Sequence, residues 1–119
     1  MSVSEEMDGD DNSLRVLLQI LSEPRRRYAL YHLRRHEETT VTRLADNVAG
    51  WMDAERSEPL SGQEQVHIYT ELHHTDIPRF TAAGIVRLHE QEERVEVVSF
   101  PDVLSDLLDV TLEFDDGAM

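Results

Sequence analysis

Polar side chains that can form hydrogen bonds recur along one segment in the middle of the sequence. They are Gln63, Gln65, His67, Thr70 and His74. A glutamine can pair with the edge of an adenine, and a threonine hydroxyl can contact either base of a pair. If the segment is a helix with an outward face, these side chains are suited to the major groove of DNA. The alternative is a solvated face or a face that binds a protein partner.

The same segment also carries metal-binding residue types at helical spacing. His67, Glu71 and His74 stand at i, i+4 and i+7, and imidazole and carboxylate groups are zinc ligands. The outer two are about 10 Å apart along a helix axis, so the three side chains converge poorly on one ion. The sequence has no H-E-x-x-H motif, nucleophile elbow or phosphate-binding glycine loop. We therefore predict no metal site, no cofactor and no enzymatic activity.

All the basic residues are arginines, and some are placed to contact a DNA backbone. The candidates for phosphate contacts are Arg25, Arg26, Arg43, Arg87 and Arg94. Arg25 and Arg26 belong to a basic cluster near the start of a predicted helix, and Arg87 and Arg94 flank a predicted hairpin. The alternative is that the clustered arginines pair with nearby glutamates and pack over the core.

The charge balance is strongly acidic, with 25 Asp and Glu against 11 Arg, a net charge of -14 and no lysine. This composition resembles the surfaces of proteins from salt-accumulating haloarchaea. In molar salt the Debye length falls to about 3 Å, so the net charge does not exclude DNA as a ligand. High salt also weakens the counterion release that normally drives phosphate binding, so direct contacts to bases would have to contribute more.

The chain length of 119 residues suits one small domain. The absence of cysteine excludes disulfides and thiolate metal sites. Residues 1–12 are acidic and poor in apolar side chains, which predicts a disordered arm. No apolar run approaches the length of a membrane span, and no secretory signal is recognisable. We therefore expect a cytoplasmic location and no membrane partner.

Hydrophobic spacing of three and four residues predicts a mainly α-helical domain over residues 13–112 with a small β-hairpin. Ser61 and Glu64 form a capping box that starts a helix running to about Thr75, and Pro78 disfavours helix at Ile77. The remaining predicted helices cover residues 13–22, 24–36, 41–52, 79–83 and 101–114. Strands are expected at 85–90 and 94–99, with Val86 and Leu88 matched by Val95 and Val97. Residues 37–40 are read as a polar turn, and residues 113–119 are expected to fray.

Two long stretches, LSEPRRRYALYHLRRHEETTVTRLADNVA and LHHTDIPRFTAAGIVRLHEQEERVEV, resemble winged-helix regulators of bacteria and archaea. Over residues 14–100 the chain is similar to a haloarchaeal winged-helix family of largely unassigned function. The matching features are Glu23-Pro24-Arg25-Arg26-Arg27-Tyr28, Trp51, and the run from Tyr69 to Val86. The resemblance implies a winged helix-turn-helix with an extra helix at each end.

For function, the same resemblance implies a DNA-binding protein of the transcription-regulator type, with double-stranded DNA as its ligand. The alternative is a winged-helix module that binds a protein and not DNA. Two departures favour the alternative. Gln65 and Val66 stand where such domains often carry Lys or Arg, and Asp76 stands where a histidine is common.

The two terminal helices carry leucine stripes that a small domain cannot easily cover. The residues are Leu14, Leu17, Leu18, Leu21, Leu104, Leu107 and Leu108. We expect these stripes to form a two-fold homodimer interface, which would set two DNA-reading helices about one turn of DNA apart. The alternative is that the stripes pack within the chain's own core.

Overall fold

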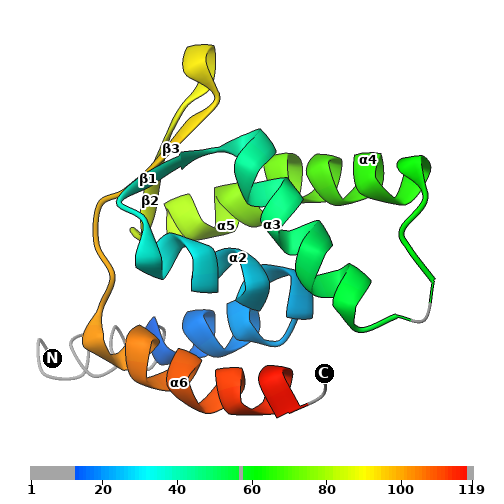
Figure 1. Ribbon diagram of the computed structural model, residues 1–119. Helices are drawn as coiled ribbons and strands as arrows, with labels where there is room; N and C mark the ends of the chain where they lie inside the picture. The colour runs from blue at the N-terminus through cyan, green and yellow to red at the C-terminus, as the bar shows by residue number, and fades with distance from the viewer. Residues whose placement is uncertain (1–12, 57, 118–119) are drawn as a thin grey trace, which may run out of the picture.

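The fold is a winged helix-turn-helix with an additional helix at each end (Figure 1). The computed structural model describes residues 13–56 and 58–117. The chain opens with an N-terminal helix (residues 13–21). It continues through α2 (Pro24–Arg35), β1 (Glu38–Thr40), α3 (Val41–Ala54), α4 (Gly62–Glu71), a π-helical turn (Leu72–Asp76), α5 (Ile77–Ala82), β2 (Val86–His89), a 3-10 turn (Glu90–Glu92), β3 (Arg94–Val97) and α6 (Asp102–Gly117). The acidic arm expected at residues 1–12 lies outside the described residues.

One hydrophobic core joins the helices, the π-helical turn and strands β2 and β3. Its largest fully buried side chains include Tyr28, Leu30, Leu33, Leu44, Leu72, Ile77, Phe80, Ile85, Leu104 and Leu108. Pro24 lies in the first turn of α2, where no backbone N–H is needed. The Thr40 hydroxyl accepts the backbone N–H of Arg43 at 3.1 Å and so caps α3. These local signals set the helix starts, and the apolar stripes then pack α2, α3 and α4 together.

The sheet has three antiparallel strands in the order β1-β3-β2. The predicted hairpin register is confirmed, because Val86 pairs with Val97 and Leu88 with Val95. The prediction of a polar turn before α3 is wrong at Glu38–Thr40, which forms β1 and pairs with β3. Thr39 lies opposite Val95 and is buried. Three residues are too few to show strand periodicity, so only pairing with β3 defines this strand.

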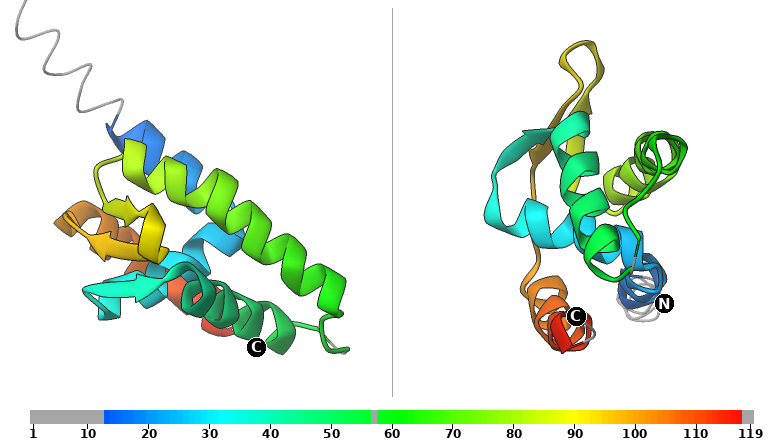
Figure 2. Two further views of the ribbon diagram at one scale, coloured as in Figure 1. Left: turned by 90° about the horizontal axis from the view of Figure 1, so that it is seen from above. Right: turned by 45° about the vertical axis from the view of Figure 1, so that its right-hand side comes forward.

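The predicted helix break at Ile77 is also wrong. Ile77 has helical dihedral angles (φ -60°, ψ -43°), and its N–H bonds to the carbonyl of Leu72 five residues earlier. This π-helical turn widens the backbone just before Pro78, whose ring would otherwise crowd the carbonyl four residues back. The extra residue also turns Ile77 and Phe80 toward the core. Consequently α4, the π-helical turn and α5 form one continuous rod, which Figure 2 shows from above.

The N-terminal helix and α6 lie side by side below α2, on the side of the molecule opposite the wing (Figures 1 and 2). The prediction that the leucine stripes form a dimer interface is wrong for Leu17, Leu21, Leu104 and Leu108, which are buried in the chain's own core. Leu107 is partly buried against that core. Leu14 and Leu18 remain exposed.

The expected fraying of residues 113–119 is not seen over the described part, because α6 continues to Gly117. Asp115 holds the end of this helix against α2. Its carboxylate accepts two hydrogen bonds from Arg27, at 2.9 and 3.0 Å, and one from the Tyr31 hydroxyl at 2.5 Å. Burial, followed by the hydrogen bond to Asp115, raises the pKa of Tyr31 to about 12.

We predict that stability falls at alkaline pH because of Tyr31. Its folded pKa lies above the ordinary value of 10.0, so the neutral phenol stabilises the fold fully below pH 10, and this contribution is lost as the pH rises toward 12. Urea unfolding at several pH values from 9 to 12 should show a steeper loss of stability for the native chain than for Tyr31→Phe. Equal slopes for the two chains would contradict the prediction.

Candidate nucleic-acid interface

The helix α4 and the π-helical turn after it hold the predicted DNA-reading residues in exposed positions. The capping box predicted from the sequence is present, with Ser61 and Glu64 each bonding the other's backbone N–H. Ile68 and Leu72 are buried beneath the helix. Gln63, Gln65, His67, Thr70 and His74 are all exposed. The core contacts therefore orient α4 so that its polar residues meet solvent.

Four of these five residues share one face of the rod. Gln63, His67, Thr70 and His74 follow each other at intervals of four, three and four residues, which a helix brings into line. Gln65 points to the opposite side by the same geometry, so it does not join the other four. The apolar side chain of Val66 is 65% exposed on α4. The exposed face of α4 is thus mainly polar, with Val66 at its margin and the partly exposed carboxylates of Glu64 and Glu71 along its edge.

The wing is tied to this rod through Glu93. The Tyr69 hydroxyl donates to the Glu93 carboxylate, and this bond is the main reason that the pKa of Tyr69 is raised. The Glu93 carbonyl accepts the backbone N–H of Val41 at 2.9 Å. Glu93 itself has φ 49°, the left-handed conformation that closes the hairpin turn in place of the usual glycine or asparagine. One residue therefore joins the wing, α4 and the start of α3.

The two wing arginines are partly neutralised by neighbouring carboxylates. Arg94 bonds both Glu92, at 2.8 Å, and Glu38, at 3.0 Å. Arg87 is 66% exposed in its side chain and has a weaker contact with Glu96 at 3.7 Å. Of the two, Arg87 is the better placed to meet a phosphate.

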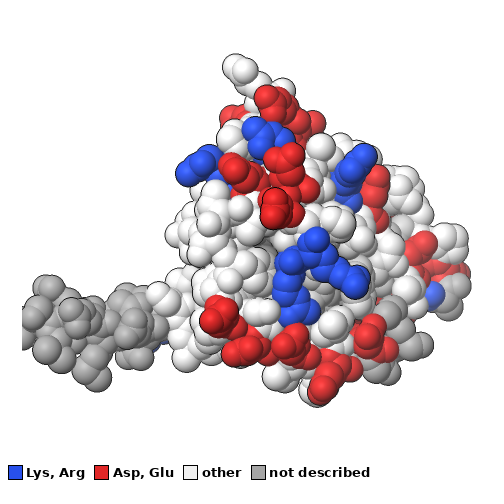
Figure 3. Space-filling view, turned by 60° about the vertical axis from the view of Figure 1, so that its left-hand side comes forward, with Lys and Arg blue, Asp and Glu red and all other residues white. Residues whose placement is uncertain are grey.

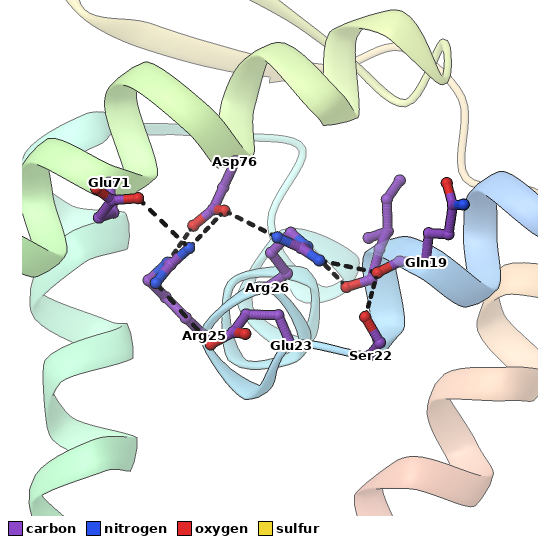
Figure 4. A network of polar contacts seen from close by, with 8 residues as sticks. Gln19, Ser22, Glu23, Arg25, Arg26, Glu71 and Asp76 are labelled. Atoms are coloured by element: carbon purple, nitrogen blue, oxygen red, sulfur yellow. Dashed lines mark hydrogen bonds and ion pairs between the residues drawn. The ribbon is translucent and has the colours of Figure 1, made fainter.

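Arg25 and Arg26 do not belong to an outer surface, because both guanidinium groups surround the buried carboxylate of Asp76 (Figure 4). Arg25 donates from Nε and Nη2 at 2.5 and 3.0 Å. Arg26 approaches the same carboxylate at 3.6 Å and donates to the carbonyls of Ile20 and Gln19. Their expected role as phosphate contacts is therefore corrected to a structural one, although the main partner is the distant Asp76 and not the nearby glutamates of the alternative interpretation.

This Asp76 cluster, formed by Arg25, Arg26 and Asp76, is the strongest polar contact between α2 and the rod. Asp76 is fully buried at the end of the π-helical turn. Glu71 and Glu23 lie 3.9 Å from Arg25 at its edges. From the sequence, Asp76 is only a departure from the histidine that is common at this position in similar domains. Its partners are 50 or more residues away in the chain, so no local pattern signals the pairing.

Arg43 remains as a candidate for a phosphate contact. It is exposed in the first turn of α3. Within residues 13–56 and 58–117, no carboxylate lies within 4.0 Å of its guanidinium group. Over the same residues no group of three or more His, Asp or Glu side chains is arranged to hold a metal ion. None of the described helices has the length and apolar character needed to cross a bilayer.

Comparison with protein families matches residues 18–96 to a family described as a domain of unknown function (DUF7344). Comparison with curated proteins gave no significant match, and comparison with solved structures gave none either. The matched region runs from the N-terminal helix through β3 and includes α4, the Asp76 cluster and the wing. It covers more than half of the chain, and the chain therefore belongs to the DUF7344 family.

Proposed function

We propose that this protein binds double-stranded DNA through α4, as a transcription-regulator-like protein adapted to high salt. The observation that supports this best is the exposed polar face of α4, with Gln63, His67, Thr70 and His74 in line beside the wing. A helix with such a face fits the major groove, where amide and hydroxyl side chains can bond to base edges. The Tyr69–Glu93 bond would keep the wing at a constant angle to α4.

In this proposal base contacts contribute more affinity than phosphate contacts. Arg43 and Arg87 are the candidates for backbone contacts, and each neutralised phosphate contributes about -0.9 to the slope of log affinity against log salt. We therefore expect a shallow slope of about -1 to -3, in keeping with a surface of net charge -14. A protein of this kind suits the molar salt of a halophilic archaeon, where its acidic surface is screened within about 3 Å.

The direct test is a fluorescence anisotropy titration of duplex fragments, selected from a random library, in molar KCl. We predict that Gln63→Ala and Thr70→Ala each weaken the selected duplex by roughly tenfold or more, because a base contact contributes about 1–3 kcal/mol. Gln65→Ala is the matched control, since Gln65 is equally exposed but lies on the opposite side of the helix. Loss of affinity in the control as large as in Gln63→Ala would overturn the assignment of the reading face.

A second candidate function is a protein–protein interaction module. Two observations favour it: α4 carries no Lys or Arg, and Val66 exposes an apolar side chain on that helix. This candidate replaces the first under two conditions. No duplex binds at any salt concentration, and the double variant Gln63→Ala with Thr70→Ala no longer binds a protein partner that Gln65→Ala still binds.

We also propose a homodimer, through residues other than those expected from the sequence. The outer side of α6 carries a stripe of apolar side chains at four, three and four residue intervals, here called the outer stripe: Val103, Leu107, Val110 and Phe114. Val110 is 61% exposed and Phe114 80% exposed. This spacing is that of a helix-pairing seam, and the exposed Leu14 and Leu18 lie on the neighbouring N-terminal helix.

Charge indicates which surface of the second copy meets the outer stripe. The exposed edge of α6 is acidic, with Asp102, Asp106, Asp109, Glu113 and Asp116, so two α6 helices would repel each other. Residues 13–21 carry Arg15 and no acidic residue, so we propose that α6 of one copy packs on the N-terminal helix of the other.

Because this layer lies opposite the wing and α4 (Figure 1), the two α4 faces would point apart and each would meet its own DNA segment. This proposal replaces the expectation of two reading helices side by side on one duplex.

A further inference from the structure

The basic groups of this acidic protein are distributed unevenly. Seven of the eleven arginines have a carboxylate within 4.0 Å. Over the described residues, the arginines without such a partner are Arg15, Arg35, Arg43 and Arg79. Arg35 lines a small hollow between α2 and α3, and Arg43 lies one helical turn before Asn47, which also lines it. Figure 3 shows basic side chains gathered on one face between acidic side chains above and below them.

The hollow has a volume of about 120 Å³ and is lined by Tyr31, His32, Arg35, His36, Asn47 and Trp51. The rings of His32 and His36 are one helical turn apart, with their centroids separated by 4.3 Å. The Nε2 atom of His32 lies 3.3 Å from the Thr39 hydroxyl. Burial lowers the pKa of His32, and the charges of His36 and Arg43 lower it further. Among residues 13–56 and 58–117, no carboxylate lines this hollow.

A larger hollow beside this one differs from it by having carboxylates in its lining. It shares Arg35 and His36 but is also lined by Glu37, Glu38 and Glu96, whose charges would repel an anion. The smaller hollow instead offers cationic and neutral donors. The C-terminal end of α2 carries a partial charge of about -0.5, which repels an anion. This partial charge is smaller than the two full positive charges of Arg35 and Arg43.

From this arrangement we infer that the hollow between α2 and α3 is a binding site for a phosphate-type oxyanion. Guanidinium groups match the geometry of phosphate oxygens, so Arg35 and Arg43 would supply the charge. The His36 ring and the Asn47 amide would supply further hydrogen bonds. At about 120 Å³ the hollow has room for one tetrahedral oxyanion. The site lies apart from the exposed face of α4, so this inference does not rest on the proposed reading of DNA bases.

The site can be tested with inorganic phosphate alone, at constant ionic strength, by following the imidazole NMR signals of all six histidines of the full chain. We expect saturable shifts of His32 and His36, and no saturable shift of His67, His73, His74 or His89. Arg35→Gln should weaken phosphate binding about tenfold or more, because it removes a full positive charge and a charge-assisted hydrogen bond. Arg79→Gln is the matched control, since it removes an equally exposed charge from α5.

Two further measurements identify the source of the phosphate group. If the group belongs to DNA, Arg35→Gln weakens duplex binding and inorganic phosphate competes with the duplex. If it belongs to a free phosphate compound, Arg35→Gln leaves duplex binding unchanged while phosphate binding is still lost. Either result supports the site. Uniform, non-saturating shifts of all six histidines, or an equal effect of Arg79→Gln, would overturn it.

Discussion

Replacing Asp76 by alanine is expected to destabilise the fold by about 3–5 kcal/mol, because it leaves Arg25 and Arg26 without their buried counter-charge. The Asp76 carboxylate is fully buried and bonds Arg25 through both oxygens. The Arg25 side chain is itself only 15% exposed, so water cannot replace the lost partner. A domain of this kind has a total stability of about 5–15 kcal/mol, and urea unfolding should therefore show a large fall in the midpoint.

The matched control is Glu23→Ala, which removes a carboxylate 3.9 Å from the same guanidinium but at the exposed edge. Such an exposed pair contributes about 0–1 kcal/mol. If Asp76→Ala does not fold at all, the two single variants Arg25→Ala and Asp76→Asn and the double variant that combines them still measure the coupling. We expect the paired changes to be less than additive by about 0.5–3 kcal/mol. An Asp76 variant no less stable than Glu23→Ala would show that the Asp76 cluster does not stabilise the rod.

Substituting Val110 and Phe114 together by aspartate is expected to convert the proposed dimer into a monomer. Each buried side chain of this size contributes about 1.5–3 kcal/mol, and a two-fold interface contains each one twice. The dissociation constant should therefore rise by at least about a thousandfold. Sedimentation equilibrium in molar KCl should show the mass falling from twice the chain mass to 13.7 kDa.

The control for this pair is Val66→Asp with Val98→Asp, which adds the same charge at exposed apolar side chains away from α6. We expect the control to stay dimeric. The Val110 and Phe114 variant should also keep its affinity for a single duplex, because the outer stripe lies opposite α4. A native chain that sediments as a monomer, or a variant that remains dimeric, would contradict the proposed interface.

Membership of the DUF7344 family and a winged-helix fold leave the function open, because one fold supports many functions. Function is therefore decided by single surfaces of the molecule. The exposed face of α4, the outer stripe of α6 and the hollow between α2 and α3 are separate, and each has a variant that leaves the other two unchanged. Their tests can fail independently.

The positions of the helices, the capping box at Ser61 and the hairpin register could be read from the sequence. Each depends on residues within about four positions of one another or on matched apolar patterns in neighbouring strands. The outward orientation of Gln63, His67, Thr70 and His74 follows in the same way from the inward stripe of Ile68 and Leu72. The sequence by itself thus determined the winged-helix arrangement and the exposed face of α4.

Only the tertiary structure decided how the arginines are used and which leucines are exposed. Arg25 meets Asp76 across 51 positions and Arg27 meets Asp115 across 88, and β1 exists only because β3 lies beside it. A π-helical turn at Leu72–Asp76 changes the phase of the helix by one residue and brings Asp76 inside. Local periodicity carries no information about such distant partners, because their energies depend on the burial and geometry that arise only when the whole chain has packed.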